Sequence, residues 1–246
     1  MDFDYKESKK RIIDILSSKT EIKEVDKIPS DESNFTYENG VRSWVGSIFI
    51  DIINSSELFK EDNSEKVARI MRAFCSEIID ILRKNDNYRQ IGIRGDCIYA
   101  IYSTPYQSDL HAILNDAILI NTFQKMFNKL LSENSFPTFS IGIGLGASKD
   151  LIVKAGKKGT GIRDYIWIGS AVVNASKLSS QGNRDSFEPI VMDSTFYSNI
   201  KEFKANKDHM YSHYFSKKQS NKLDEYVYHG DMIYCEYNDW INGGMK

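Results

Sequence analysis

The sequence contains few cysteines and prolines, no excess of charge of either sign and no long apolar run. Its cysteines, Cys75, Cys97 and Cys235, include no Cys-x-x-Cys pair, which argues against a zinc site and against a disulfide framework. The formal net charge of −2 gives no basic field, so neither a nucleic acid nor an anionic membrane is an expected partner. No segment approaches a membrane span and the N-terminus lacks the apolar core of a signal peptide, so we expect a cytoplasmic location.

The composition is that of an ordinary globular protein. Of 246 residues, 41% are apolar and 27% are charged, which suffices for one large domain or for a domain with an extension. There is no internal repeat and no low-complexity segment. Any functional signal must therefore lie in short motifs and their spacing.

One apolar stretch near residue 50 contains a single carboxylate. The isoleucines of Ile48–Ile52 alternate with Phe49 and Asp51, so a strand would place Asp51 on the opposite face from the isoleucines. The stretch is apolar and β-branched enough for an inner strand. An aspartate there is unfavourable unless it binds a metal or pairs with a cation. The alternative is an aspartate that only ends the strand.

Residues typical of a helix start follow this strand directly. Asn54 can cap a helix, and Glu57, three residues later, completes a pattern similar to a capping box. The free N–H groups of Asn54, Ser55 and Ser56 would face phosphate oxygens while the Asp51 carboxylate holds a cation. The whole stretch therefore suits a metal-bound polyphosphate.

Hydrophobic periodicity predicts alternating helices and strands over much of the remaining chain. Glycines on alternate positions of the strand at 138–146 would let another backbone or a ligand come close. The predicted helices are 64–84, 109–132, 170–180 and 195–200. The predicted strands are 42–52, 138–146, 151–153, 165–168 and 189–192, with a hairpin at 88–102 that turns at Gly95-Asp96.

The two ends of the chain are less regular. Residues 1–19 are expected to form an amphipathic helix that either covers an edge of the domain, which we favour, or contacts a partner. Residues 21–39 are expected to be a connector. Asn39-Gly40 is a turn signal for a hairpin that leads into the first strand. Near the C-terminus, 211–221 is polar and rich in aromatic residues, and 226–237 is expected to be a closing strand or hairpin.

The main elements follow the order β-α-β-β-α-β, and a small α/β appendage comes after them. This order predicts an α+β fold built on the ferredoxin-like split unit. We expect an N-terminal helix and connector at 1–40 and one domain, which includes the C-terminal appendage, at 41–246.

In this topology the first strand and the central hairpin are neighbours, so Asp51 and Asp96 would approach each other. Two such carboxylates would repel, and the pKa of each would rise unless cations lay between them. Paired acids of this kind bind two divalent ions, which stabilise the attacking and leaving oxygens of a phosphoryl transfer.

Three motifs follow one another over about 44–192. They are Phe49-Ile50-Asp51-Ile52 with Asn54-Ser55-Ser56, Gly95-Asp96 with Ile98-Tyr99-Ala100, and Trp167-Ile168-Gly169 with Val172-Val173-Asn174-Ala175-Ser176-Lys177-Leu178. In type and order these motifs resemble those of the class III nucleotide cyclases. The sequence has no Gly-Gly-Asp-Glu-Phe signature, which argues against diguanylate cyclases, and its near-neutral charge argues against polymerases that bind duplex nucleic acid.

The resemblance implies a homodimer whose active sites lie at the interface between two chains. One chain would supply two divalent cations, Mn²⁺ or Mg²⁺, and the other would supply the helix of the third motif. The implied residues are Asp51, Asp96 and the Ile52 carbonyl for the metals, Asn54, Ser55 and Ser56 for the triphosphate, Asn174 for the ribose and Lys177 for the developing charge.

Two positions on the third motif depart from the family pattern. Lys177 stands where an arginine is usual, so a point charge replaces a planar fork. Counted from Gly169, the position where the family has asparagine falls on Val173 and not on Asn174. A shift of one residue rotates a helical side chain by about 100°. Trp167 either stacks on the base or packs in the core.

The two positions that distinguish purine bases in this family are Gly92 and Ile166 here. Neither side chain can hydrogen-bond a purine edge, so a purine would not be selected. Arg94 lies on the same strand face as Gly92 and Asp96, where it either reaches a base carbonyl or phosphate or forms a structural ion pair.

These departures, with the sequence Lys158-Gly159-Thr160-Gly161, resemble the pyrimidine cyclases of bacterial Pycsar anti-phage systems. The resemblance implies formation of cyclic UMP from UTP or cyclic CMP from CTP, and a separate effector protein that the product activates. We expect UTP, because uridylate cyclases are the commoner branch. The alternative from another functional class is a catalytically silent domain of cyclase fold that binds a nucleotide or only dimerises.

Overall fold

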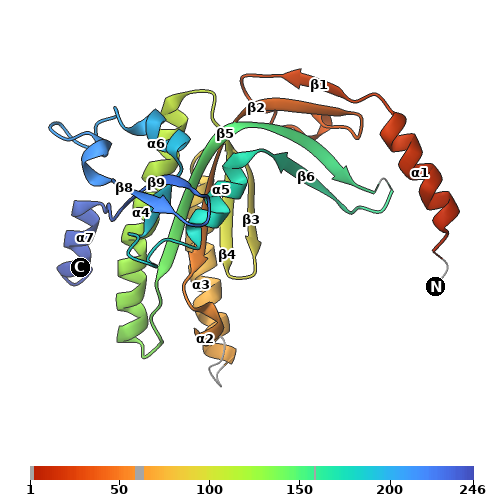
Figure 1. The fold of residues 1–246 in the computed structure, drawn as a ribbon. Coiled ribbons are helices and arrows are strands. Elements are labelled where there is room, and N and C mark those ends of the chain that lie inside the picture. Colours follow the sequence, from red (N-terminus) through yellow and green to blue (C-terminus); the bar gives the residue numbers. More distant parts are fainter. Residues whose placement is uncertain (1–2, 59–63, 158) are drawn as a thin grey trace.

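The computed structural model describes residues 3–58, 64–157 and 159–246 (Figure 1). The described strands are β1 (Glu21–Glu24), β2 (Asn39–Ile52), β3 (Tyr88–Arg94), β4 (Cys97–Ser103), β5 (Ile141–Gly156), β6 (Arg163–Ile168), β7 (Ile190–Met192), β8 (Ser216–Ser220) and β9 (Glu225–Gly230). The described α-helices are α1 (Tyr5–Ser17), α2 (Ser55–Leu58), α3 (Ser64–Arg83), α4 (Gln107–Glu133), α5 (Ser170–Ser179), α6 (Ser194–Ile200) and α7 (Cys235–Asn242).

The described strands form one mixed sheet in which β2 is central. Its main path is β3-β4-β2-β5-β7-β9-β8, while β1 pairs with β2 and β6 pairs with β5. The first four strands of this path, with α3 and α4, form the predicted ferredoxin-like β-α-β-β-α-β unit. The predicted α+β fold is confirmed, and the C-terminal appendage continues the same sheet through β7, β9 and β8.

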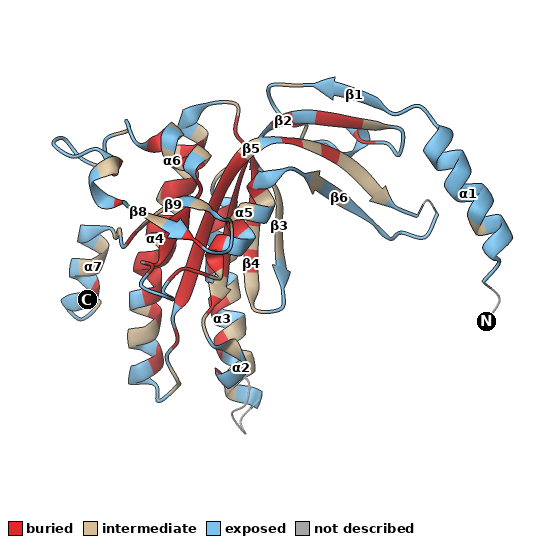
Figure 2. Ribbon diagram, in the orientation of Figure 1, coloured by how far each residue is buried: buried red, intermediate tan, exposed pale blue. Residues whose placement is uncertain are grey.

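Helices α3 and α4 cover one face of the sheet, and most buried side chains lie between them and the strands (Figure 2). Ile48 and Ile50 of β2 and Phe74 of α3 are all fully buried there. A helix of period 3.6 and a strand of period 2 both present apolar residues to this layer, as the sequence pattern requires.

Helix α5 lies on the other face, directly against β5. A Cβ atom on Gly144 would stand 2.0 Å from the carbonyl oxygen of Ala175, and one on Gly146 would stand 2.3 Å from that of Ala171. Only glycine permits this distance between helix and strand backbones. The prediction that these glycines admit a neighbouring backbone is confirmed.

The predicted connector and the hairpin at Asn39-Gly40 are wrong. β1 lies within 21–39 and pairs in parallel with β2, which already begins at Asn39. The Asn39 side chain accepts a hydrogen bond from the Thr36 N–H at 2.8 Å, so it orders the chain before the strand. Ile28 is buried in the same domain, so the segment before residue 40 is part of the packed structure; the boundary at residue 40 stays a prediction.

The strands predicted at 138–146 and 151–153 are a single strand, β5. Its pairing with β2 runs without interruption from Ile52↔Ile141 to Gly40↔Val153. A continuous ladder satisfies each backbone group in turn, so the polar residues between the two apolar segments do not end the strand. The distal halves of β2 and β5, with β1 and β6, form an arm that extends from the helical layers (Figure 1).

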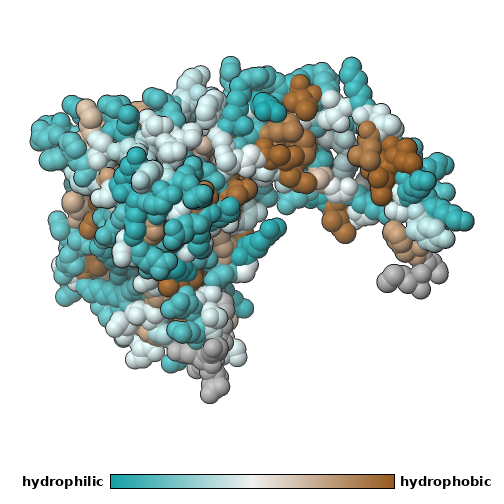
Figure 3. Space-filling view, in the orientation of Figure 1, coloured by the Kyte–Doolittle hydropathy of each residue, from teal (hydrophilic) through white to brown (hydrophobic). Residues whose placement is uncertain are grey.

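Helix α1 does not cover an edge of the domain, contrary to the prediction. It has no buried residue, and its apolar side chains Ile15 and Leu16 are 72% and 79% exposed. The helix lies beyond the end of the arm, where hydrophobic residues gather on the molecular surface (Figure 3).

The C-terminal predictions are correct only in part. The polar stretch at 211–221 contains β8, which pairs with β9 at the end of the sheet, where polar side chains are tolerated. The predicted strand at 226–237 ends at Gly230 in β9, and α7 follows. Helix α7 is held on α4 by the Lys129 ammonium, which donates to the Ile241 carbonyl at 2.6 Å. None of the described helices combines the length and apolarity needed to cross a membrane.

Candidate active site

The two acids singled out by the sequence lie at the same end of the sheet. In β2, Asp51 stands between Cys97 of β4 and Gly142 of β5. Asp96 precedes Cys97 in the β3–β4 turn, where Gly95 has a φ of 64°. Burial raises the pKa of Asp51, and the nearby charge of Asp96 raises it further, so the repulsion between the acids is present.

An arginine that the sequence analysis did not identify occupies this end of the sheet. The Arg184 guanidinium donates from Nη2 to Oδ2 of Asp51 at 2.8 Å and to the Ile52 carbonyl at 3.5 Å. These are two of the groups expected to hold a cation. The Asp51 and Arg184 side chains are 20% and 27% exposed, so the ion pair is open to solvent on one side.

The close approach of α5 to β5 positions Arg184. A Cβ atom on Gly142 would stand 2.1 Å from the carbonyl oxygen of Ser179, so the end of α5 lies against the strand next to Asp51. The chain then turns tightly, with a φ of 55° at Asn183, and Arg184 donates from Nη1 back to the Ser179 carbonyl at 3.4 Å. Asp51 and Arg184 are 133 residues apart and no motif links them, so only the fold brings them together.

The donor groups at this end of the sheet suit a hard divalent cation. Asp51, Asp96 and the Ile52 carbonyl offer oxygen ligands only, as Mg²⁺ and Mn²⁺ prefer. In the described part of the chain no group of three His, Cys, Asp or Glu side chains could hold a metal. The guanidinium on Asp51 is itself a cation, which shows that the carboxylate accepts positive charge here.

The segment predicted to receive phosphates follows β2 at once. Asn54 has a φ of 55°, and its carbonyl accepts the Glu57 N–H at 2.9 Å. Ser55 and Ser56 open the short helix α2, where the first N–H groups have no partner within the helix. A cavity of about 350 Å³ adjoins Asn54 and Glu57.

A larger cavity, of about 510 Å³, lies between the β3–β4 hairpin, β6 and α5. Arg94, Val173 and Lys177 line it, as does Trp167. Val173 and Lys177 are four residues apart on α5 and therefore share one face of the helix. Val173, which the count from Gly169 puts at the position of the family's asparagine, therefore lies in the cavity wall beside Lys177.

Asn174 does not belong to the described residues that line this cavity. Its Nδ2 donates to Oδ2 of Asp193 at 3.1 Å, and the other oxygen of Asp193 accepts the Phe196 N–H at 2.8 Å. A rotation of about 100° per residue turns Asn174 away from the face shared by Val173 and Lys177. In this structure Asn174 orders the start of α6, and its role at the ribose stays a prediction.

A network of hydrogen bonds centred on Gln90 crosses the wall of the 510 Å³ cavity. The Trp167 indole donates from Nε1 to Oε1 of Gln90 at 2.7 Å. The Gln90 amide donates from Nε2 to the Tyr99 hydroxyl at 3.3 Å and to Oδ1 of Asp164 at 3.2 Å. The sequence analysis missed Gln90 and assigned no role to Tyr99 of the second motif. The available signal was that Gln90 precedes Gly92 by two residues and so shares its strand face.

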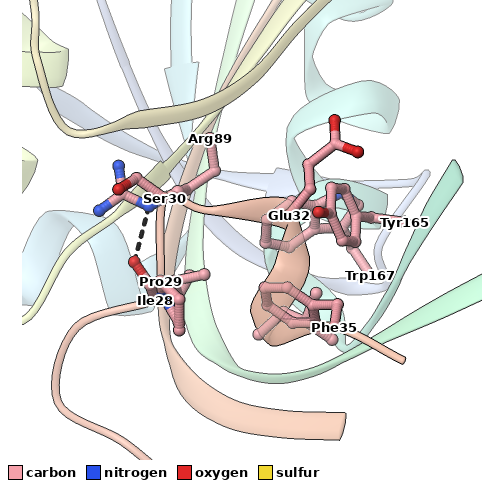
Figure 4. Close-up of a pocket in the computed structure, with 9 residues that line it drawn as sticks. Ile28, Pro29, Ser30, Glu32, Phe35, Arg89, Tyr165 and Trp167 are labelled. Atoms are coloured by element: carbon pink, nitrogen blue, oxygen red, sulfur yellow. Dashed lines mark hydrogen bonds between the residues drawn. The ribbon is translucent and has the colours of Figure 1, made fainter. Parts of the chain in front are cut away.

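Trp167 also borders a second, smaller cavity. This cavity, of about 90 Å³, is lined by Trp167 and Tyr165 of β6 and, on the opposite side, by Arg89 (Figure 4). Arg89 donates from Nε to the Ile28 carbonyl at 2.8 Å and so holds the chain behind the indole (Figure 4). Trp167 thus packs in the interior on one side and borders the larger cavity on the other.

Comparisons with known proteins agree with this geometry. Residues 40–220 match the family described as the adenylate and guanylate cyclase catalytic domain. The chain belongs to this family. That membership agrees with the class III resemblance.

The chain is similar to two proteins named uridylate cyclase. One, from Treponema porcinum, is 42% identical over 245 residues, which cover 100% of this chain and 83% of the relative. The other, from Gulbenkiania mobilis, is 29% identical over 248 residues, which cover 97% of this chain and 95% of the relative. The crystal structure of the adenylyl cyclase CyaB from P. aeruginosa shares the fold, with a TM-score of 0.64 and 19% identity over 78% of this chain and 95% of that one.

Proposed function

We propose that this member of the cyclase family is a uridylate cyclase, which converts UTP into 3′,5′-cyclic UMP and pyrophosphate. The main support is the relative named uridylate cyclase that is 42% identical along the whole chain. Gly92 and Ile166, which cannot hydrogen-bond a purine edge, also support a pyrimidine substrate. A cytidylate cyclase that forms cyclic CMP from CTP is the alternative.

The acidic end of the sheet would bind the cations and the triphosphate. Asp51, Asp96 and the Ile52 carbonyl would hold two divalent cations, Mn²⁺ or Mg²⁺. When bound, such ions lower the pKa of the ribose 3′-hydroxyl and neutralise phosphate charge. The N–H groups of Ser55 and Ser56 would receive phosphate oxygens from the substrate.

The cavity side would bind the nucleoside and stabilise the developing charge. The ribose 3′-oxygen attacks the α-phosphorus in line and pyrophosphate leaves. Lys177 would stabilise the negative charge that grows on the phosphoryl oxygens. Arg94, at the mouth of the same cavity, would bind the triphosphate.

The active site would form at the interface of a homodimer, with the acids from one chain and the cavity from the other. Ile166 and Val173 line the cavity and are both 47% exposed, so a second chain that covers them would bury apolar surface. The product would act as a second messenger in anti-phage defence through a separate effector protein. A cytoplasmic location remains part of this proposal.

The test is to incubate purified protein with UTP, CTP, ATP and GTP in turn, with Mn²⁺, and to identify the products by mass. Cyclic UMP as the main product would support the proposal. Mainly cyclic CMP would favour the cytidylate alternative, and cyclic AMP or GMP would contradict the argument from Gly92 and Ile166.

One observation favours a catalytically silent domain as a second candidate. The Arg184 guanidinium already neutralises Asp51, and a silent domain would keep this pair closed. The incubation with Mn²⁺ and each of the four nucleotides distinguishes the two candidates, because a silent domain would form no cyclic product from any of them.

A further inference from the structure

The Tyr99 side chain occupies the space that a side chain at position 92 would fill. The two residues are paired across β3 and β4. A Cβ atom on Gly92 would stand 2.6 Å from both Cζ and the hydroxyl oxygen of Tyr99. A longer side chain at 92 and this position of Tyr99 therefore exclude each other, and the tyrosine hydroxyl lies where a base-contacting side chain would begin.

The Tyr99 ring is held in place from one side. It stacks on Phe49 with the ring centroids 5.1 Å apart and the planes 13° apart. Both rings line the 510 Å³ cavity. A stacked aromatic pair cannot move aside without losing its contact area, so the ring limits the depth of the cavity beside Gly92.

The hydrogen bonds around Gln90 fix the direction of every donor in the network. The indole of Trp167 can only donate, so the Gln90 oxygen must face Trp167 and its NH₂ group must face Tyr99 and Asp164. The Tyr99 oxygen accepts from Gln90, which leaves its own proton free to be donated. Burial raises the pKa of Tyr99, so the hydroxyl keeps that proton at neutral pH.

We propose that Tyr99 selects uracil because its hydroxyl donates to the uracil 4-carbonyl. Cytosine has an amino group at that position, and a donor facing a donor is unfavourable. Gln90, oriented by Trp167 and Asp164, is the positioning residue. The inference rests on the proposed function, because it names the residue that distinguishes UTP from the other nucleotides.

The first test replaces Tyr99→Phe, which removes the hydroxyl and keeps the ring. Binding of 3′-deoxy-UTP and 3′-deoxy-CTP, which cannot cyclise, is measured by calorimetry with Mn²⁺. We expect the preference for the uracil compound to fall about tenfold, through weaker binding of the uracil compound. Tyr226→Phe, at an exposed site on β9, is the control and should change neither affinity. An unchanged preference in the Tyr99 variant would overturn the inference.

The second test reverses the network without changing its shape. In Gln90→Glu combined with Asp164→Asn, residue 90 can only accept, so the Tyr99 proton turns toward it and the tyrosine oxygen presents a lone pair to the base. We expect 3′-deoxy-CTP to become the tighter ligand. Gln219→Glu on β8 is the matched control. Continued preference for the uracil compound would contradict the inference.

These binding ratios separate the inference from the proposed function. If the unmodified protein forms no cyclic nucleotide but Tyr99→Phe loses the uracil preference, the proposed activity fails and the assignment of Tyr99 stands. If the unmodified protein forms cyclic UMP but both variants keep the preference, only the assignment fails. Tighter binding of 3′-deoxy-CTP by the unmodified protein would also overturn the assignment.

Discussion

The acidic end of the sheet and the cavity around Gln90 are built on the same hairpin but act through different forces. At the acidic end, Asp51, Asp96 and Arg184 are charged and partly open to solvent. Arg94 and Lys177 in the cavity are charged too, but the contacts of Gln90 with Trp167 and Tyr99 there are neutral hydrogen bonds. Charge, including that of Lys177, acts on the triphosphate, which every nucleotide shares, whereas directed neutral bonds act on the base. Variants should therefore divide into those that change the rate and those that change the choice of base.

The largest effect is expected from Asp51→Ala. Loss of this carboxylate removes a ligand of both cations, so turnover should fall about a thousandfold or more with every nucleotide. Cyclic products are quantified by mass, and circular dichroism checks that the fold is kept. Normal turnover in this variant would show that the metal assignment is wrong.

Lys177→Ala should have the next largest effect. Removal of a cation that stabilises the transition state lowers the rate about a hundredfold, and the ratio of UTP to CTP turnover should not change. Lys125→Ala, at an exposed site on α4, is the matched control. A change in the ratio of UTP to CTP turnover without a change in rate would show that Lys177 selects the base and does not act on the phosphate.

Arg184→Met tests whether the guanidinium occupies the place of a cation. Without it, a half-buried carboxylate loses its partner, so the metal-free protein should lose about 1 to 3 kcal/mol of unfolding free energy. Mn²⁺ binding, measured by calorimetry without nucleotide, should tighten about tenfold because no competing cation remains. Weaker Mn²⁺ binding would instead mean that Arg184 supports the metal site.

The smallest effect is expected from Trp167→Phe. The change removes the indole donor that orients Gln90 and keeps an aromatic ring, so the preference for UTP over CTP should fall about threefold. Mn²⁺ binding should be unchanged, since Trp167 does not touch the acidic end. A loss of metal binding here would show that the two regions are not independent.

Sequence reasoning located the acids because strand alternation and a glycine turn are local properties. The positions of Asp51 and Asp96 follow from patterns a few residues long, and so does the close approach permitted by Gly144 and its neighbours. Asn174, which contacts Asp193 and does not line the cavity, shows the limit of such local patterns. One residue of helical phase decides which side chain faces a cavity, and the sequence contained both possibilities.

The local pattern alone determined that this chain is an α+β protein with two acids at adjoining strand ends. It also determined that neither Gly92 nor Ile166 offers a side chain that could hydrogen-bond a purine. The tertiary structure alone decided that Arg184 neutralises Asp51, that Tyr99 lies over Gly92, and that α1 stands apart from the domain. These contacts join residues on different elements, and the angle and distance between elements depend on packing that no single segment encodes.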